Sequence, residues 1–244
     1  MKRYLHAFAM CQSMFCAIAC PWQVWDEDAR PLMLLFLPVV GLEIGLIWAA
    51  LAWGCQVIGL PPMVTGLILC AYPNLVTGFI HLDGFMDVTD AVKSCRDLER
   101  RREILKDSHV GSFAVIGTVL LMIAQFALFS SGSGDWRILI FVPVVSRCGS
   151  ALAVTLLRPM STSQYAGQER RKRLGLILGM MLLLAVGAGF LLCGKYGFAL
   201  VGGVAGYAVA LRRGYRSLGG MNGDISGYAL TISELCAVAV YALI

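Results

Sequence analysis

Charged residues are scarce in this chain of 244 residues, because Asp, Glu, Lys and Arg together make up only 14% of it. An ordinary soluble domain carries about 25%. The hydrophobic share is 58%. This composition excludes a disordered protein, a protein that coats nucleic acid and a typical water-soluble enzyme. It predicts a single integral membrane domain, residues 1–244, with most of its mass in lipid.

Paired cysteine motifs are also missing, since none of the nine cysteines belongs to a C-x-x-C pair. A zinc site or a disulfide framework is therefore not expected, and the cysteines are interpreted as small buried hydrophobes of a reducing, cytoplasm-facing protein. The apolar segments do not alternate with polar residues as the strands of a membrane barrel would. The sequence predicts an all-α fold, a polytopic helical bundle.

Seven apolar stretches are long enough, or nearly so, to cross a hydrocarbon layer of about 30 Å as helices. They are residues 32–53, 62–80, 110–129, 138–157, 174–193, 196–211 and 228–244. The opening stretch 5–20 is shorter and carries polar side chains, so it fits either a half-span or a helix at the membrane interface. A signal peptide is disfavoured because Pro21 would directly follow the cleavage site. Glycines four residues apart within three of the stretches predict close helix packing.

Basic residues gather on one side of the predicted topology. If loop 54–61 lies outside, only Arg137 and Lys195 of the 20 lysines and arginines fall in outside loops, and Arg147 lies within a span. This distribution is a strong positive-inside signature. The basic run 170–173 is interpreted as part of that signature rather than as a ligand site.

The connector 81–109 differs from a simple topological loop, because it holds seven of the chain's 15 acidic residues. Asp83, Asp87 and Asp90 are spaced i, i+4 and i+7, which places them within about 60° of one another on a helix. Three such carboxylates repel one another unless a cation lies among them. Their hard oxygen ligands suit Mg²⁺ or Mn²⁺ completed by substrate phosphates. The alternative is the acidic face of a solvated amphipathic helix.

Other residues of the connector are candidates for the same site. Arg100, Arg101 and Lys106 could bind phosphate oxygens. Gly84 either admits a ligand close to the backbone or packs against a neighbouring helix. His81 falls on the opposite helix face, where a capping or packing role is as reasonable as a direct role in the site.

Charged residues also occur within or beside the predicted spans. Glu43, Arg147 and Glu234 lie in apolar segments, where a charge at the bilayer centre costs about 3 kcal/mol or more. They are expected to pair in one buried cluster, either as a structural ion pair or around a wet cavity. Asp224 lies in a glycine-rich turn before the last span, and it fits a metal or phosphate contact or an ordinary turn.

Several motifs resemble those of the cobalamin synthase family, the adenosylcobinamide-GDP ribazoletransferases of vitamin B12 biosynthesis. The specific part is H-L-D-G-F-M-D-V-T-D at 81–90, followed by E-R-R-x-x-I-L-K-D-S-x-V-G-S-F at 99–113. Supporting motifs are P-V-V-G-L-E-I-G at 38–45 and G-G-M-N-G-D-I-S-G at 219–227. Departures from the family pattern at His109, Tyr228 and Thr231 concern the flanking contacts.

The resemblance implies a reaction, a cofactor and a location. A hydroxyl of α-ribazole, or of its 5′-phosphate, attacks the cobinamide-side phosphorus of adenosylcobinamide-GDP, and GMP leaves. The implied cofactor is Mg²⁺, and the partners are these two substrates and the lipid bilayer, with no nucleic acid. The implied location is the cytoplasmic membrane of a bacterium or archaeon, with the active site facing the cytoplasm.

The resemblance also assigns roles to the acidic and basic residues. Asp83, Asp87 and Asp90 are expected as metal ligands. The remaining expected site residues, which include candidates for a second metal, a base and phosphate contacts, are Asp107, Asp224, Arg100, Arg101, Lys106 and His81.

Two other classes of membrane protein fit the sequence less well. A CDP-alcohol phosphatidyltransferase would place Ala-Arg after its D-G-x-x element, whereas Asp87-Val88 stands there. A transporter or channel would spread its acids through the membrane depth, with Glu43, Arg147 and Glu234 along the path. The gathering of acids at one face favours the enzyme.

Overall fold

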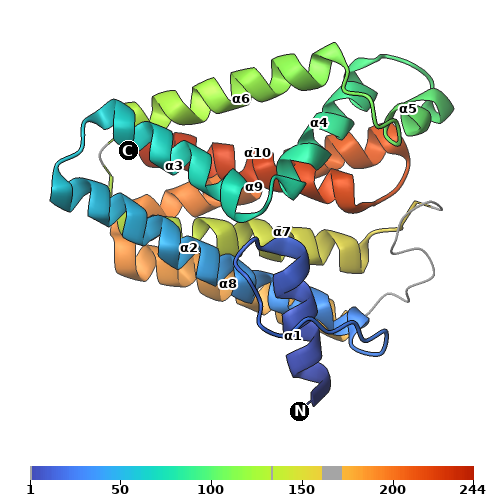
Figure 1. Cartoon of the computed structure of the whole chain (residues 1–244), viewed down its shortest axis with the longest axis horizontal. Coiled ribbons are helices and arrows are strands. Elements are labelled where there is room, and N and C mark those ends of the chain that lie inside the picture. The colour runs from blue at the N-terminus through green and yellow to red at the C-terminus, as the bar shows by residue number, and fades with distance from the viewer. Residues whose placement is uncertain (1, 133, 161–171) are drawn as a thin grey trace.

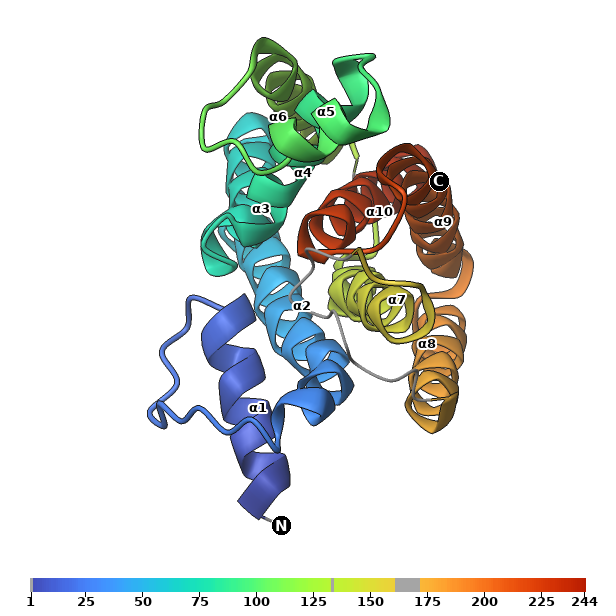
Figure 2. The ribbon, with the colours of Figure 1, turned by 90° about the vertical axis from the view of Figure 1, so that its right-hand side faces the viewer.

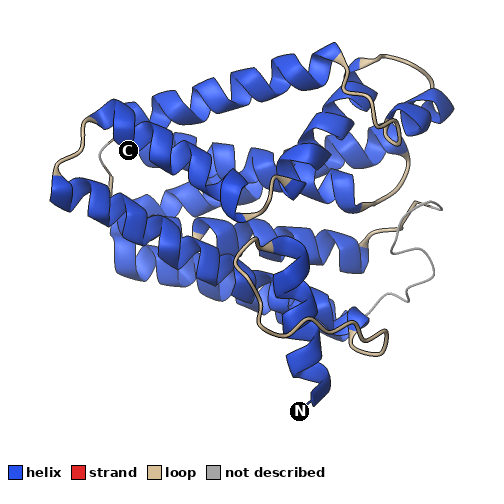
Figure 3. Cartoon of the chain, viewed as in Figure 1, coloured by secondary structure: helices blue, strands red, loops and turns tan. Residues whose placement is uncertain are grey.

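The computed structural model describes residues 2–132, 134–160 and 172–244. Within these ranges every regular element is a helix (Figure 3). The α-helices are α1 (Lys2–Phe15), α2 (Met33–Ile58), α3 (Pro62–Val76), α4 (Ile80–Lys93), α5 (Leu98–Ile104), α6 (Ser112–Ser131), α7 (Val142–Leu156), α8 (Lys172–Cys193), α9 (Phe198–Leu218) and α10 (Gly223–Leu243). Short 3₁₀ helices are η1 (Arg30–Leu32), η2 (Trp136–Ile140) and η3 (Gly194–Gly197).

The long helices lie roughly along the long axis of the molecule, so their ends gather at two opposite ends of the bundle (Figure 1). Five helical segments in the described part of the chain are long and apolar enough to cross a membrane, and a sixth is added if α3 and α4 form one bent span. The five are Arg30–Ile58, Ser112–Ser131, Trp136–Leu156, Lys172–Leu218 and Gly223–Leu243. The predicted polytopic helical bundle is confirmed.

The number of segments is lower than the seven predicted spans for two reasons. Predicted spans 174–193 and 196–211 both lie within the single segment Lys172–Leu218, where η3 turns the chain and Phe190 meets Phe198 edge to face at 5.1 Å. The prediction of a continuous helix over 62–80 is wrong, because α3 ends at Val76 and α4 is bent from it by 89°. The turn contains Gly78 and Phe79, both with positive φ.

The glycine pairs pack helices closely at two of the three predicted places. A Cβ atom on Gly41 would lie 2.6 Å from a backbone oxygen of α7, and Gly45 faces the backbone of η2 just as closely. A Cβ atom on Gly202 or on Gly206 would lie 2.6 Å from a side-chain atom of α10. Gly179 has open space around it, so only its partner Gly175 makes a packing contact. Small residues in lipid allow such close backbone approach.

The N-terminal helix α1 is too short for a full crossing, since 14 residues span about 21 Å. It lies steeply across α2 (Figure 1), and Phe8 packs edge to face on Phe36 at 5.9 Å. The loop that follows exposes Trp22 and Trp25, residues typical of a membrane interface. Of the two alternatives for residues 5–20, a half-span and an interfacial helix, this geometry favours the interfacial helix.

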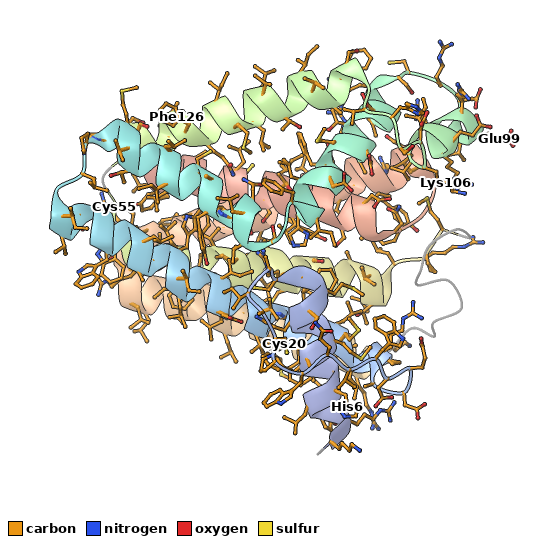
Figure 4. The ribbon with its side chains drawn as sticks, viewed as in Figure 1. His6, Cys20, Cys55, Glu99, Lys106 and Phe126 are labelled. Carbon is orange, nitrogen blue, oxygen red and sulfur yellow. The ribbon has the colours of Figure 1, made fainter. Side chains whose placement is uncertain are left out.

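Different elements lie at the two ends of the bundle. The end that faces the viewer in Figure 2 carries α5, the loop before α10 and the end of α1. Figure 4 places Glu99 and Lys106 at this end and Cys55 at the opposite end. Six of the nine cysteines are buried, as predicted, whereas Cys20 and Cys236 are partly buried and Cys95 is exposed.

Candidate active site

Helix α4 carries the three predicted carboxylates along one face. Asp83, Asp87 and Asp90 are separated by about 6 Å and then about 4.5 Å along the helix axis. The opposite face buries Phe85 and Val88 in the core. The amphipathic pattern therefore fixes the rotation of α4 and leaves the carboxylates only partly covered.

A fourth carboxylate, Asp224, reaches this face from the first turn of α10. The helices cross where Gly84 has no side chain, since a Cβ atom there would lie 2.9 Å from the backbone oxygen of Asp224. Gly84 thus serves helix packing, one of its two predicted roles. Asp87 lies within electrostatic range of Asp83, Asp90 and Asp224, and Asp224 lies within range of Asp83.

Asn222, which the sequence analysis did not single out, holds Asp224 in place. Its side-chain nitrogen donates to Oδ2 of Asp224 at 2.5 Å, and its side-chain oxygen accepts from the Ile225 N–H at 3.0 Å. Asn222 is therefore the N-cap of α10. The signal was present in the sequence, because asparagine before an apolar helix is a common N-cap.

The carboxylates of Asp83 and Asp87 form no hydrogen bond or ion pair with the residues that the structure describes. In the same part of the chain, no three His, Cys, Asp or Glu side chains converge closely enough to enclose a metal ion. Magnesium is usually held by one or two protein carboxylates, water and substrate phosphates rather than by an all-protein cage. The donor set on α4 and α10 fits an ion of that kind, shared with a phosphate substrate.

Asp90 binds the start of α6, a contact that its spacing along α4 does not predict. Its Oδ2 accepts from the Gly111 N–H at 2.6 Å, and its Oδ1 accepts from the Ala114 N–H at 2.9 Å. Both donors belong to the start of α6, whose N-cap residue Gly111 has no side chain of its own for capping. Asp90 therefore caps α6 from 21 residues away and joins that helix to α4.

The basic residues of α5 face other partners. Arg101 donates to the Ser217 carbonyl at 3.3 Å, and Arg102 donates to the Leu218 carbonyl at 2.9 Å, so both stabilise the C-terminus of α9. Arg100 pairs with Glu103 at 2.6 Å on the surface. Lys106, labelled in Figure 4, is exposed at the outer edge of the same end.

Asp107 also lies apart from the carboxylates of α4. It is exposed in the loop between α5 and α6, where its Oδ1 accepts from the backbone N–H of His109 at 3.0 Å and lies 2.7 Å from the His109 ring nitrogen. These hydrogen bonds lower the pKa of Asp107 below its usual value. Of the predicted site residues, Asp83, Asp224 and His81 line one cavity. Its lining does not include Asp87, Asp90, Asp107, Arg100, Arg101 or Lys106.

A cavity of about 430 Å³ adjoins Asp83 and Asp224. Its lining comes from α1, α2, α4, α7 and the start of α10: Met14, Phe15, Leu34, Leu37, Ile80, His81, Asp83, Ser150, Val154, Asn222, Gly223, Asp224, Ser226 and Gly227. A second cavity of about 490 Å³ shares Met14, Ile80 and Asp83 with it. Asp83 therefore stands between two spaces, each large enough for a ligand.

His81 is buried in the wall of the first cavity, with 8% of its surface exposed. Its ring lies parallel to that of Phe15, with 6.1 Å between centroids. The Nε2 atom is buried and has no hydrogen-bond partner in the described part of the chain. Buried polar atoms in proteins are usually satisfied, so this one requires an explanation.

The predicted charged cluster within the spans is confirmed for two of its three members. Arg147 and Glu234 form a buried ion pair at 2.6 Å, and the Ser146 hydroxyl donates to the same Glu234 oxygen at 2.9 Å. Glu43 lies within electrostatic range of the neighbouring Tyr72 and Cys16, but the described residues include no ion pair for it.

A bundle of apolar helices with carboxylates and a cavity at one end defines a polytopic membrane protein with an acidic site. The model of the CobS family, described as cobalamin-5-phosphate synthase, matches residues 7–242. This chain therefore belongs to the CobS family, as its motifs indicated.

Full-length relatives support the same assignment. An adenosylcobinamide-GDP ribazoletransferase of Clostridium perfringens (strain SM101 / Type A) is 34% identical over all of both chains. The enzyme of that name from Clostridium botulinum (strain Alaska E43 / Type E3) is 30% identical over 96% of each chain. The one from Desulfitobacterium hafniense (strain Y51) is 34% identical over 82% of each. No solved structure matches the chain.

Proposed function

We propose that this chain is an adenosylcobinamide-GDP ribazoletransferase. A hydroxyl of α-ribazole, or of its 5′-phosphate, forms a bond to the cobinamide-side phosphorus of adenosylcobinamide-GDP, the bond from that phosphorus to GMP breaks, and adenosylcobalamin or its phosphate results. The family and its full-length relatives support this reaction. The observation that supports it is that Asp83 and Asp224 line one cavity and Asp87 lies within electrostatic range of both, without a cationic partner for these carboxylates among the described residues.

The chain's own residues supply positioning and proton transfer. Asp83 and Asp87 are the residues that would hold Mg²⁺, and the ion would neutralise negative charge on the diphosphate when bound. Asn222 binds one oxygen of Asp224 and fixes that carboxylate. The other oxygen is then placed to accept the proton of the acceptor hydroxyl as the new P–O bond forms. The N-terminus of α10 presents its positive dipole end to the phosphate oxygens.

The distribution of cations supports a cytoplasmic active site in the cytoplasmic membrane. The carboxylate end of the bundle carries the basic residues of α5 and those near the end of α9, whereas Arg137 and Lys195 lie at the other end. Positive loops remain in the cytoplasm during insertion. This orientation also gives the site access to soluble nucleotides.

The orientation can be tested with Cys95, which is exposed directly after α4. A membrane-impermeant maleimide is expected to label Cys95 in inside-out vesicles and not in intact cells. A Lys195→Cys variant that also carries Cys95→Ser should show the reverse pattern. Labelling of Cys95 from outside the intact cell would contradict the proposed orientation.

The reaction can be tested with purified Asp87→Ala. Parent and variant are incubated with adenosylcobinamide-GDP, α-ribazole and Mg²⁺, and corrinoid products are separated by chromatography. The variant is expected to lose at least about a hundredfold in rate, because it lacks one ligand of the ion. Glu99→Ala, an exposed acid-to-alanine change on α5, is the matched control and should remain active. Full activity of Asp87→Ala would remove that carboxylate from the mechanism.

A further inference from the structure

We propose that the cavity beside Asp83 and Asp224 binds the acceptor nucleoside, with its planar base against the wall formed by α1, α2 and α7, while the corrinoid of the donor remains outside. This inference rests on the proposed function and assigns one of its two substrates to particular residues. The ligand class is an apolar, bicyclic aromatic base attached to ribose.

The polarity of the walls favours this assignment. Phe15 from α1, Leu37 from α2 and Val154 from α7 contribute apolar lining. Asp83 and Asp224, from α4 and α10, contribute acidic lining. An apolar base has the right chemistry for the first group, and a ribose with its hydroxyls has the right chemistry for the second. A nucleoside bound in this direction brings a hydroxyl to the proposed base, Asp224.

The size of the space distinguishes between the two substrates. The cavity holds about 430 Å³, which lies within the range of small-molecule sites, about 300–1,000 Å³. A benzimidazole riboside has about 20 non-hydrogen atoms and is a ligand of that scale. A corrin macrocycle with its side chains is several times larger. The adjoining cavity of about 490 Å³ shares Asp83 and leaves room for the nucleotide of the donor on the other side of that carboxylate.

The pair formed by His81 and Phe15 is an independent indication of a ligand. The two rings are stacked on each other, parallel to within 8°, and both residues belong to the cavity wall. The Nε2 atom of His81 is buried and without a partner in the described part of the chain. A polar atom of a bound nucleoside would satisfy that nitrogen.

Val154 is the residue on which the test depends, because it lines the cavity and is only partly buried. Val154→Phe fills the space needed by the base and is expected to raise KM for α-ribazole at least tenfold, while KM for adenosylcobinamide-GDP changes less than about twofold. Equilibrium dialysis with α-ribazole alone should show the same loss of affinity. Val154→Ala, which cannot overpack the core, should weaken the binding of α-ribazole by about tenfold, because contacts with the base are lost.

The matched control is Leu156→Phe, on the same helix but outside the cavity lining, and it should leave both KM values unchanged. Three outcomes would overturn the assignment: an unchanged KM for α-ribazole in both Val154 variants, an equal rise for both substrates, or a rise for the donor alone. If any of these outcomes occurs while the parent enzyme transfers ribazole normally, the proposed function stands and only this inference is wrong. A parent without transfer activity would remove both.

Discussion

Replacing Asp90 by alanine distinguishes metal binding from helix capping, the two roles assigned to the acidic face of α4. The spacing of Asp83, Asp87 and Asp90 suggests three equivalent ligands, whereas the structure uses both oxygens of Asp90 to cap α6. The variant removes two hydrogen bonds to backbone N–H groups of Gly111 and Ala114. Those donors lie in the first turn of a helix that supplies no side-chain cap of its own.

The cost can be worked out from the hydrogen bonds. Loss of an N-cap typically costs about 0.5–2 kcal/mol, and hydrogen bonds to a charged acceptor contribute about 1.5–3 kcal/mol. Because Asp90 is partly exposed, we expect less than the sum of two such bonds, about 2 kcal/mol, which is the upper end of the N-cap range. For a chain of this size such a loss lowers Tm by about 4–8 °C.

The assay follows thermal unfolding of the purified protein in detergent and, separately, the Mg²⁺ concentration that gives half-maximal activity. Asp90→Ala should lower Tm and leave the Mg²⁺ requirement unchanged within about twofold. Asp90→Asn keeps one acceptor oxygen, so its Tm should lie between those of Asp90→Ala and the parent. Asp87→Ala should show the opposite behaviour, with an unchanged Tm and little activity. A variant at Asp90 with normal Tm and a strongly raised Mg²⁺ requirement would refute the capping role.

Two further predictions concern buried contacts. Arg147→Met should destabilise the protein by about 3–5 kcal/mol, because it leaves Glu234 buried without its partner, and the double variant with Glu234→Leu should recover most of that loss in the same unfolding assay. Gly84→Ala should lower kcat by about tenfold or more, because its Cβ would press on the backbone of Asp224, and small displacements of reacting groups are costly. The control Gly179→Ala, which meets open space, should retain activity and gain up to about 1 kcal/mol from helix propensity; equal activities of the two alanine variants would contradict the argument.

The sequence predicted the α4 helix and the rotation of its acidic face, because the periods of the apolar residues and of the aspartates are local properties of a single helix. It also predicted most of the apolar segments to within several residues. It did not predict the bend after Val76, where two positive-φ residues turn the chain within an apolar stretch that composition alone describes as continuous.

The partners of the charged residues could not be read from their spacing. Arg101 could bind phosphate by its chemistry, yet it donates to a carbonyl of Ser217, 116 residues away. Asp90 lies on the same face of α4 as Asp83. Its role differs because the start of α6 lies beside it and donates to it. Such choices depend on which helix ends meet, and a one-dimensional pattern does not contain that information.

The amino-acid sequence by itself determined the membrane environment, the helical class and the family, because hydropathy and motifs are written along the chain. It also predicts the sidedness of the basic loops from their charge. Only the tertiary structure decided which acids lie within electrostatic range of one another. The crossing of α4 and α10 at Gly84 brings Asp224 to Asp83 and Asp87 across more than a hundred residues, while capping occupies Asp90. The physical reason is that helix packing, not sequence distance, sets the separation of side chains on different helices.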